Sequence, residues 1–515
     1  MTTERGAHER RARRRAEAAT TIPQTPWARW RNPLPPLAPL DDGELDRIES
    51  VAFRVLEDLG LEFMSNDALD ILSRHGAKVV DRATGLVRMD RGLVAEYVAK
   101  APAQFTLHAR NPDRNLTIGG DWINIHTVGG APNISDLDNG RRAGTFADQC
   151  NLMRLQQSLN CVHFAGGTQV EAQDLPVPTR HLDMHRAQVT ISDRVFGARG
   201  IGRSRVKDAI RIAAIARGVS HEDIVRQPST YTITNTNSPR RVDKELLGGL
   251  MELAENGQAV CVTPFTLAGA MAPITLAGAL AQQHAEALGV IAFTQMVRPG
   301  APVVYGGFTS NVDMRSGAPA FGTPEYVRAT IIGGQLARRR KLPYRASNVN
   351  ASNTVDAQAT YESAMSIWAC VMSHTNMMHH GTGWLEGGLV ASMEKAIIDA
   401  EMLQTMRAWL APLDVGDEAL AFEAIRDIAP GGHFFGSSHT LQRFEHAFHR
   451  PLVSDVRNYE NWLEAGAPDA TRRANGVWKK LLQNFEPPPI DAAKLEAIDA
   501  YIAVRREDIE AKGLN

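Results

Sequence analysis

Long hydrophobic runs are missing from this sequence, and so is an excess of charge of either sign. No apolar stretch approaches the roughly 20 residues that a membrane helix needs, so no transmembrane segment is expected. Lysine and arginine number 56 against 58 acidic residues, a formal net charge of −2. This balance gives no electrostatic reason to expect nucleic acid or an anionic membrane as a partner. A signal-peptide core is also lacking, because Arg10 to Arg15 lead into Ala/Thr/Pro-rich sequence.

Cysteine is scarce, and the familiar motifs of several enzyme classes are absent. The four cysteines lie far apart without zinc-ribbon or redox spacing, which predicts buried free thiols in a reducing compartment, the cytoplasm. There is no H-E-x-x-H motif and no H-x-H on the first predicted strand, so no directly bound metal is expected. Without a nucleophile elbow or a P-loop, hydrolase and nucleotide-binding functions lack support.

What the 515 residues do contain is a strand-and-helix unit repeated eight times. Amphipathic helices separate the predicted strands, and each unit takes roughly 30 to 45 residues, which predicts a (β/α)₈ TIM barrel over residues 121–412. The glycine fingerprint of an open doubly wound sheet is missing after the first strand. The predicted strands are Trp122–Val128, Cys161–Gly166, Arg194–Ala198, Thr230–Asn235, Ala259–Phe265, Pro302–Gly307, Pro343–Asn348 and Thr375–Gly381.

Three further regions flank the predicted barrel. Residues 1–40 are arginine-rich and then proline-rich, which predicts a flexible arm, with Trp27 and Trp30 as candidate anchors on the body or on another subunit. The arginine-rich first residues, Met1 to Ala19, are expected to be dispensable for catalysis. Residues 41–120 read as an N-terminal α+β cap, beginning with a helix capped by Asp41 or Asp42. Residues 413–515 read as a C-terminal helical extension on the outside of the barrel or over its mouth.

In a barrel of this type the chemistry belongs at the carboxyl ends of the strands. The eighth predicted strand supplies His379, His380, Trp384 and Glu386 there. Because neighbouring residues of a strand point to opposite sides, the two histidines are not expected to reach one metal ion. The other ends supply Glu171, Arg199, Tyr305, Phe308, Asn348 and Asn350.

Aromatic residues accompany carboxylates in this inventory. Ring faces beside an acidic group suit a quaternary ammonium ion, each ring contributing roughly 0.5 to 2 kcal/mol. For Phe164, Phe265 and Tyr361 the alternative of a simple core role stays open. Trp384, flanked by glycine in a turn, is expected to present its indole face to the mouth, with Glu386 on the same side.

Three motifs together resemble the trimethylamine:corrinoid methyltransferase family. They are Asp356-Ala357-Gln358-Ala359 with Tyr361-Glu362-Ser363-Ala364, His379-His380-x-x-Gly383-Trp384-Leu385-Glu386, and Gly431-Gly432-His433-Phe434 with His439-Thr440. The resemblance implies a (β/α)₈ barrel that takes a methyl group from a methylated amine. The acceptor it implies is the Co(I) of a corrinoid (cobalamin) carried by a separate partner protein.

The sequence departs from the archaeal trimethylamine enzymes at one segment. Those enzymes carry pyrrolysine just before the D-A-Q-A motif, where this chain has only standard residues, Asn348 to Asn353. Relatives without pyrrolysine act on quaternary amines such as glycine betaine, whose nitrogen already carries the charge that makes an amine leave. The resemblance therefore implies a quaternary amine as the small-molecule substrate.

Roles follow for the residues singled out above. Glu386, Glu171 and His380 are the expected catalytic residues, and Trp384, Tyr305 and Phe308 the expected cage. Arg199, Asn348, Asn350 and His380 are candidates to bind a betaine carboxylate. Two alternatives stay open, a folate-coupled demethylase that needs no corrinoid and a non-catalytic betaine-binding protein. Exposed apolar helices further predict a homo-oligomer.

Overall fold

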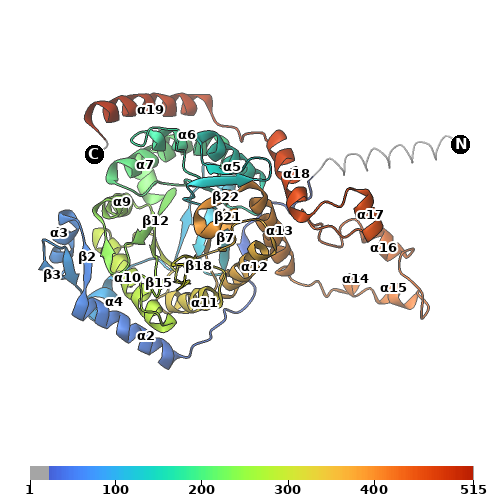
Figure 1. The fold of residues 1–515 in the computed structure, drawn as a ribbon, viewed down its shortest axis with the longest axis horizontal. Coiled ribbons are helices and arrows are strands. Elements are labelled where there is room, and N and C mark those ends of the chain that lie inside the picture. Colours follow the sequence, from blue (N-terminus) through green and yellow to red (C-terminus); the bar gives the residue numbers. More distant parts are fainter. Residues whose placement is uncertain (1–21, 514–515) are drawn as a thin grey trace.

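The computed structural model describes residues 22–513, and at its centre lies a curled sheet of nine strands (Figure 1). Eight strands run parallel, and all eight predicted strands are found with borders within a few residues. In sheet order they are β1 (Trp30–Arg31), β7 (Trp122–Thr127), β20 (Met377–Thr382), β19 (Tyr344–Ser347), β16 (Val303–Gly306), β14 (Ala259–Pro264), β12 (Thr230–Thr236), β11 (Val195–Gly197) and β10 (Phe164–Gly166).

The sheet order runs from β7 round to β10, and within the described residues no ladder of hydrogen bonds joins these two strands. Two hydrogen bonds between Ile125 and His163, one of them to the histidine side chain, link the two strands instead. The main-chain N–H of His163 donates to the carbonyl oxygen of Ile125 at 2.9 Å, and the N–H of Ile125 donates to Nδ1 of His163 at 2.8 Å. Burial lowers the pKa of His163 to about 3, so the ring is a neutral acceptor.

Helices cover the outside of the curled sheet and alternate with its strands (Figure 1). Local signals account for several of their starts. The Asp356 carboxylate accepts from the N–H of Ala359 at the start of one helix, and Pro324 opens another. The helices are α5 (Phe146–Ser158), α6 (Arg180–Ile191), α7 (Arg203–Arg217), α8 (His221–Arg226), α9 (Lys244–Glu255), α10 (Leu276–Val297), α11 (Pro324–Arg339), α12 (Ala357–Met372) and α13 (Met393–Trp409).

Short strands and turns at the sheet's carboxyl edge were not predicted. A turn at residues 137–139 closes the antiparallel pair β8 (Asn133–Asp136) and β9 (Gly140–Ala143), and Gly140 follows it with a φ of +67°. The β8 strand pairs with β22 (Val390–Ser392), which pairs with β21 (Trp384–Leu385). The remaining small strands are β13 (Arg241–Val242), β15 (Leu267–Ala268), β17 (Ser310–Val312) and β18 (Pro319–Ala320), and η3 (Glu386–Gly388) is a short 3₁₀ turn.

The region before the large sheet contains the helices and strands expected of an α+β cap, and its assignment as a separate domain stays a prediction. Asp41 caps α2 (Asp42–Arg54) in a capping box with Glu44, as predicted. The cap ends in an antiparallel pair of strands, β5 (Gln104–Leu107) and β6 (Leu116–Gly119), and also contains the helix α4 (Arg91–Val98). The other elements are η1 (Val55–Leu59), β2 (Leu61–Phe63), α3 (Asn66–Arg74), β3 (Lys78–Asp81), β4 (Leu86–Arg88) and η2 (Pro112–Arg114).

The part of the N-terminal segment that the structure describes contacts the body of the molecule. Trp30 is buried where β1 pairs with β7, and Trp27 packs edge-on against His163. These contacts confirm anchoring on the body. The predicted dispensability of the arginine-rich residues concerns a stretch, 1–21, that lies outside the described residues.

After α13 the chain contains helices and no further strand up to residue 513. Helix α18 (Ala470–Gln483) packs against α13 and α5, and α19 (Ala492–Lys512) lies over α6 and α7 (Figure 1). Between α13 and α18, residues 411–450, here called the C-terminal arm, project to one side of the body (Figure 1). None of these forty residues, all of them described, is buried. The small helices here are α14 (Asp417–Leu420), α15 (Phe422–Arg426), α16 (Ser438–Arg443) and, just beyond the arm, α17 (Tyr459–Glu464).

Burial agrees with the expectation for the cysteines. All four cysteines are buried free thiols. Over residues 22–513, no helix combines the length and the apolar composition required to span a bilayer.

Candidate active site

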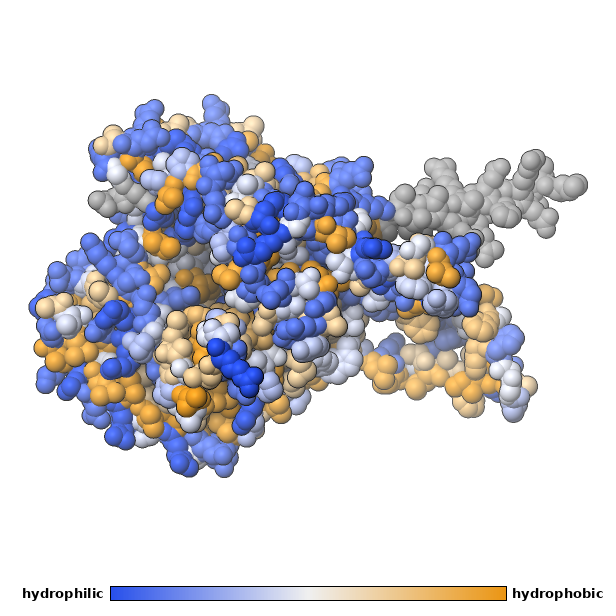
Figure 2. Space-filling view, viewed as in Figure 1, coloured by the Kyte–Doolittle hydropathy of each residue, from blue (hydrophilic) through white to orange (hydrophobic). Residues whose placement is uncertain are grey.

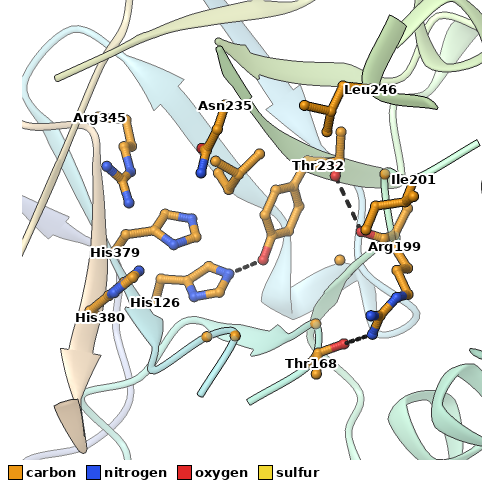
Figure 3. Close-up of a pocket in the computed structure, with 18 of the residues that line it drawn as sticks. His126, Thr168, Arg199, Ile201, Thr232, Asn235, Leu246, Arg345, His379 and His380 are labelled. Atoms are coloured by element: carbon orange, nitrogen blue, oxygen red, sulfur yellow. Dashed lines mark hydrogen bonds between the residues drawn. The ribbon is translucent and has the colours of Figure 1, made fainter. Parts of the chain in front are cut away.

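A cavity of about 440 Å³ opens at the carboxyl ends of the parallel strands, where the sequence placed the functional residues (Figure 3). Its volume falls in the range of small-molecule sites. Its walls come from the loops after β7, β10, β11 and β16 and from residues within β12, β19 and β20. The lining residues with polar or aromatic side chains are His126, Thr168, Glu171, Arg199, Tyr231, Thr232, Asn235, Phe308, Arg345, His379 and His380.

His379 and His380 both line this cavity, which corrects the expectation that they point to opposite sides of the strand. The backbone of His380 has a φ of +55°, in the left-handed region, and this breaks the alternation of side chains along β20. The register with β7 shifts between Met378 and Thr382 at the same place. The two imidazole rings lie 5.5 Å apart, centre to centre.

A third histidine completes a cluster of neutral rings. His126 stacks on His379 with ring centres 3.8 Å apart. Its Nδ1 donates to the Thr127 carbonyl oxygen at 2.9 Å, so its Nε2 accepts from the Tyr231 hydroxyl. Burial lowers the pKa of His126 to about 3 and holds the pKa values of His379 and His380 well below their usual range. The rings are therefore uncharged near pH 7 and do not repel a cation.

Arg345 is the most deeply buried charged group of the cavity, with only 2% of its surface exposed. Its guanidinium lies over the Phe308 ring, 4.9 Å from the centroid. One nitrogen, Nη1, makes a long hydrogen bond of 3.4 Å to the Gly307 carbonyl oxygen, and Nε has no partner. Burial lowers the pKa of Arg345, but a guanidinium remains protonated at pH 7.

Glu171 and Arg199, two of the predicted site residues, face each other across the open end of the cavity. Nη1 of Arg199 donates to both carboxylate oxygens of Glu171, at 3.0 and 3.1 Å. It also donates to the Thr168 hydroxyl (Figure 3). Arg180 pairs with the same carboxylate at 3.1 Å. The negative charge of Glu171 is therefore already balanced by two arginines.

Three other predicted residues lie outside the cavity lining. Glu386 forms a bidentate ion pair with Arg141 from β9, at 2.8 and 3.3 Å. The Tyr305 hydroxyl points toward α10, where it lies 3.0 Å from His284 Nδ1. Trp384 is 5% exposed and packs behind His380, with ring centres 3.9 Å apart, instead of presenting its face to the mouth.

Asn348 and Asn350 belong to the layer behind the cavity wall. The Asn350 amide donates to the carbonyl oxygen of Trp384 at 2.7 Å, and the indole N–H of Trp384 donates back to the carbonyl oxygen of Asn350 at 3.2 Å. The Asn348 amide donates to the Gly381 carbonyl oxygen at 3.1 Å. These bonds connect the loop after β19 to the turn after β20 and support His380 from behind.

A buried ion pair continues this support on α13. Lys395 and Asp399 form a salt bridge, and neither side chain is exposed. The ammonium of Lys395 also donates to the Ser363 hydroxyl at 2.8 Å, and the N–H of Gly383 donates to Asp399 at 2.8 Å. The pair therefore anchors the turn that follows β20.

Sequence reasoning missed His126, Tyr231 and Arg345. The available signal was a charged or polar residue inside a strand predicted to be buried, since such groups are rarely buried without a purpose. Across the part of the chain that is described, no group of three or more His, Cys, Asp or Glu side chains has an arrangement that could hold a metal ion.

The fold is mixed α/β, with a cavity of small-molecule size at the carboxyl edge of its parallel strands. The family model described as trimethylamine methyltransferase (MTTB) matches residues 5–510. The chain is 35% identical to a glycine betaine methyltransferase of Desulfitobacterium hafniense over 92% of this chain and 98% of that protein. The chain belongs to the trimethylamine methyltransferase family, as its motifs predicted, and is a methyltransferase.

Two further relatives widen the comparison. Identity is 30% to a trimethylamine methyltransferase of Desulfitobacterium hafniense, over 90% of this chain and 93% of that protein. It is 26% to a proline betaine:corrinoid methyltransferase of Eubacterium limosum, over 89% and 96%. A crystal structure of a hydroxylamine MtmB complex covers 87% of this chain and 95% of its own, at a TM-score of 0.44 and 10% identity, too distant a likeness to carry an argument.

Proposed function

We propose that this protein moves a methyl group from a quaternary amine of the betaine type to the Co(I) of a corrinoid carried by a separate protein. The observation that carries the proposal is the cavity of uncharged rings at the carboxyl edge, in a chain that aligns over 92% of its length with a glycine betaine methyltransferase. Ring faces attract a quaternary ammonium, which has no hydrogen to donate.

The reaction is a displacement at carbon. The C–N bond breaks, its electron pair stays on nitrogen as a neutral tertiary amine, and the methyl carbon bonds to the cobalt through the Co(I) electron pair. The chain's own contribution is to hold the ammonium with one methyl directed outward and to exclude water. Nothing in this step requires a proton, which fits the neutral histidines of the cavity.

Within the site, we assign cage roles to Phe308, Tyr231 and the rings of His126, His379 and His380, because all five line the cavity. Trp384, Asn348 and Asn350 act through His380 and the turn after β20 and are positioning residues. Glu171 and Arg199 form the rim. Glu386 and Tyr305 remain outside the cage, the former because of its pair with Arg141.

We also infer that the eight parallel strands form a (β/α)₈ barrel closed between β7 and β10. The paired hydrogen bonds between Ile125 and His163 support this, because they bridge the seam where a ladder is missing. A closed barrel would place every lining loop around one mouth, where a corrinoid protein can dock.

Methylation of cob(I)alamin tests the function directly. Purified protein with glycine betaine should convert the cob(I)alamin spectrum to that of methylcobalamin and release dimethylglycine, whereas trimethylamine should not react. A folate-coupled demethylase would release dimethylglycine without any cobalt. A non-catalytic binding protein would bind glycine betaine and leave the cob(I)alamin spectrum unchanged.

A second copy of the chain is the further partner that we infer. The C-terminal arm exposes large apolar side chains (Figure 2), and a corrinoid protein that must leave to deliver its methyl group cannot cover them permanently. The exposed residues of the arm are Leu413, Val415, Leu420, Phe422, Ile425, Phe434, Phe435, Leu441, Phe444 and Phe448.

A further inference from the structure

We infer that Arg345 is the anchor for an anionic group of the substrate, so that the site selects quaternary amines that carry a carboxylate and fixes which end of them faces the cobalt. This inference rests on the proposed methyl transfer from a quaternary amine and adds the residue that decides which amines qualify. It concerns the deep end of the cavity, where Arg345 lies beside His379 (Figure 3).

The first observation is a buried positive charge without an acidic partner, which within the described part of the chain meets only the Phe308 ring face and one long hydrogen bond to Gly307. Among the described residues, no aspartate or glutamate pairs with Arg345, and the groups of acidic type nearest to it are thiols and phenols, Cys261, Cys370, Tyr326 and Tyr344. Burial raises the pKa of each of these, so none carries a negative charge near pH 7. A buried guanidinium without a counter-ion lowers the free energy of unfolding unless another group balances its charge. A bound anion would supply that compensation.

The second observation is a group of unused hydrogen-bonding atoms around the same end of the cavity. They include Nε of Arg345, Nε2 of His379 and Nδ1 of His380, all buried without a partner. Buried polar atoms are normally satisfied, and three unsatisfied ones on adjacent strands indicate a ligand. A carboxylate accepts from a guanidinium in a planar, charge-assisted pair.

The cavity's other charges are less suited to this role. Arg199, which the sequence suggested as the carboxylate donor, is already paired with Glu171, a carboxylate that it shares with Arg180. A small anion at the rim would have to compete with Glu171, whereas at Arg345 it meets no carboxylate of the described residues. With Glu171 occupied, the lining has no free negative charge, so a bare cation such as tetramethylammonium gains only ring contacts and meets the field of Arg345.

The depth of burial sets the orientation. Arg345 is 2% exposed, whereas Ile201, which lines the same cavity at the rim, is 40% exposed. A zwitterion with its carboxylate on Arg345 must point its ammonium toward the rim, between the faces of Phe308 and the histidines. That orientation places a methyl group outward, where a cobalt in a docked partner can reach it.

The test compares ligands and variants by calorimetric binding and by melting temperature with and without ligand. Wild-type protein should bind glycine betaine at least about 100-fold more tightly than tetramethylammonium, since a charge-assisted pair is at stake. Arg345→Met should lose that preference, while Arg345→Lys should keep part of it. Arg203→Met, which removes an arginine on the outside of α7, is the matched control and should bind like wild type.

Stability separates an anchor from a structural arginine. Without ligand, Arg345→Met should melt at or above the wild-type temperature, because it removes an unsatisfied buried charge, and glycine betaine should no longer raise its melting temperature. Equal wild-type binding of the two ligands, or undiminished glycine betaine binding by folded Arg345→Met, overturns the inference but leaves the proposed methyl transfer standing. Failure of wild type to methylate cob(I)alamin from any quaternary amine overturns the methyl transfer itself.

Discussion

The Lys395–Asp399 pair offers a sharp test of how the site is held in place. Both side chains are fully buried, four residues apart on α13, and Asp399 accepts the N–H of Gly383 in the turn after β20. Replacing Lys395 by methionine keeps the volume but leaves a buried carboxylate without its positive partner. Removing one member of such a pair costs about 3–5 kcal/mol, enough to change the folded-to-unfolded ratio by a factor of about 10² to several thousand.

Urea denaturation and melting of purified variants at pH 7.5 measure this cost. Lys395→Met should unfold at clearly lower urea, and the double variant Lys395→Met/Asp399→Leu should regain most of the loss, because no charge is then left unpaired. Lys512→Met breaks an exposed pair with Asp508 at the same spacing and should leave the melting temperature unchanged.

Activity separates stability from positioning. Even where the double variant is stable, its methyl transfer should fall at least about tenfold, because Gly383 has lost its acceptor and the turn that backs His380 is less well held. If Lys395→Met melts like wild type, the pair is not a buried ion pair. If the double variant is fully active, the turn does not depend on it.

Three further outcomes are expected. Trp384→Ala should lower the free energy of unfolding by about 3–5 kcal/mol and also reduce activity, because the ring is buried behind His380. Urea midpoints and turnover measure the two effects. A fully stable but inactive variant would place Trp384 in the cage instead. Burial lowers the pKa of His126, His163 and His185 to about 3. Below about pH 6.5 the unfolded chain therefore binds more protons than the folded chain, and the free energy of unfolding should fall by about 1.4 kcal/mol per pH unit for each histidine. Urea midpoints that stay constant from pH 8 to 5 would contradict this prediction. Serine at Phe435 and at other exposed apolar positions of the C-terminal arm should lower the mass measured by light scattering, and a wild-type monomer would refute the inferred self-association.

Much of the fold followed from local pattern. The eight parallel strands were predictable because short apolar runs alternate regularly with amphipathic helices in the sequence. The carboxyl ends of these strands indicated where a cavity would form. The position of His380 near the end of β20 was correctly read from this. Its direction was not, because the left-handed backbone at His380, which breaks the alternation of side chains along the strand, has no local signal in the sequence.

The sequence by itself determined the family, the order of the main strands and helices, and which edge of the sheet holds the cavity, because these depend on short-range periodicity and on motifs. The tertiary structure alone decided which charges are free. Glu386 meets Arg141, 245 residues away, and Glu171 meets Arg199, so both expected counter-ions are already paired, while Arg345 is left without a partner. Electrostatic pairing depends on distance in space, and spacing along the chain does not reveal which residues will meet.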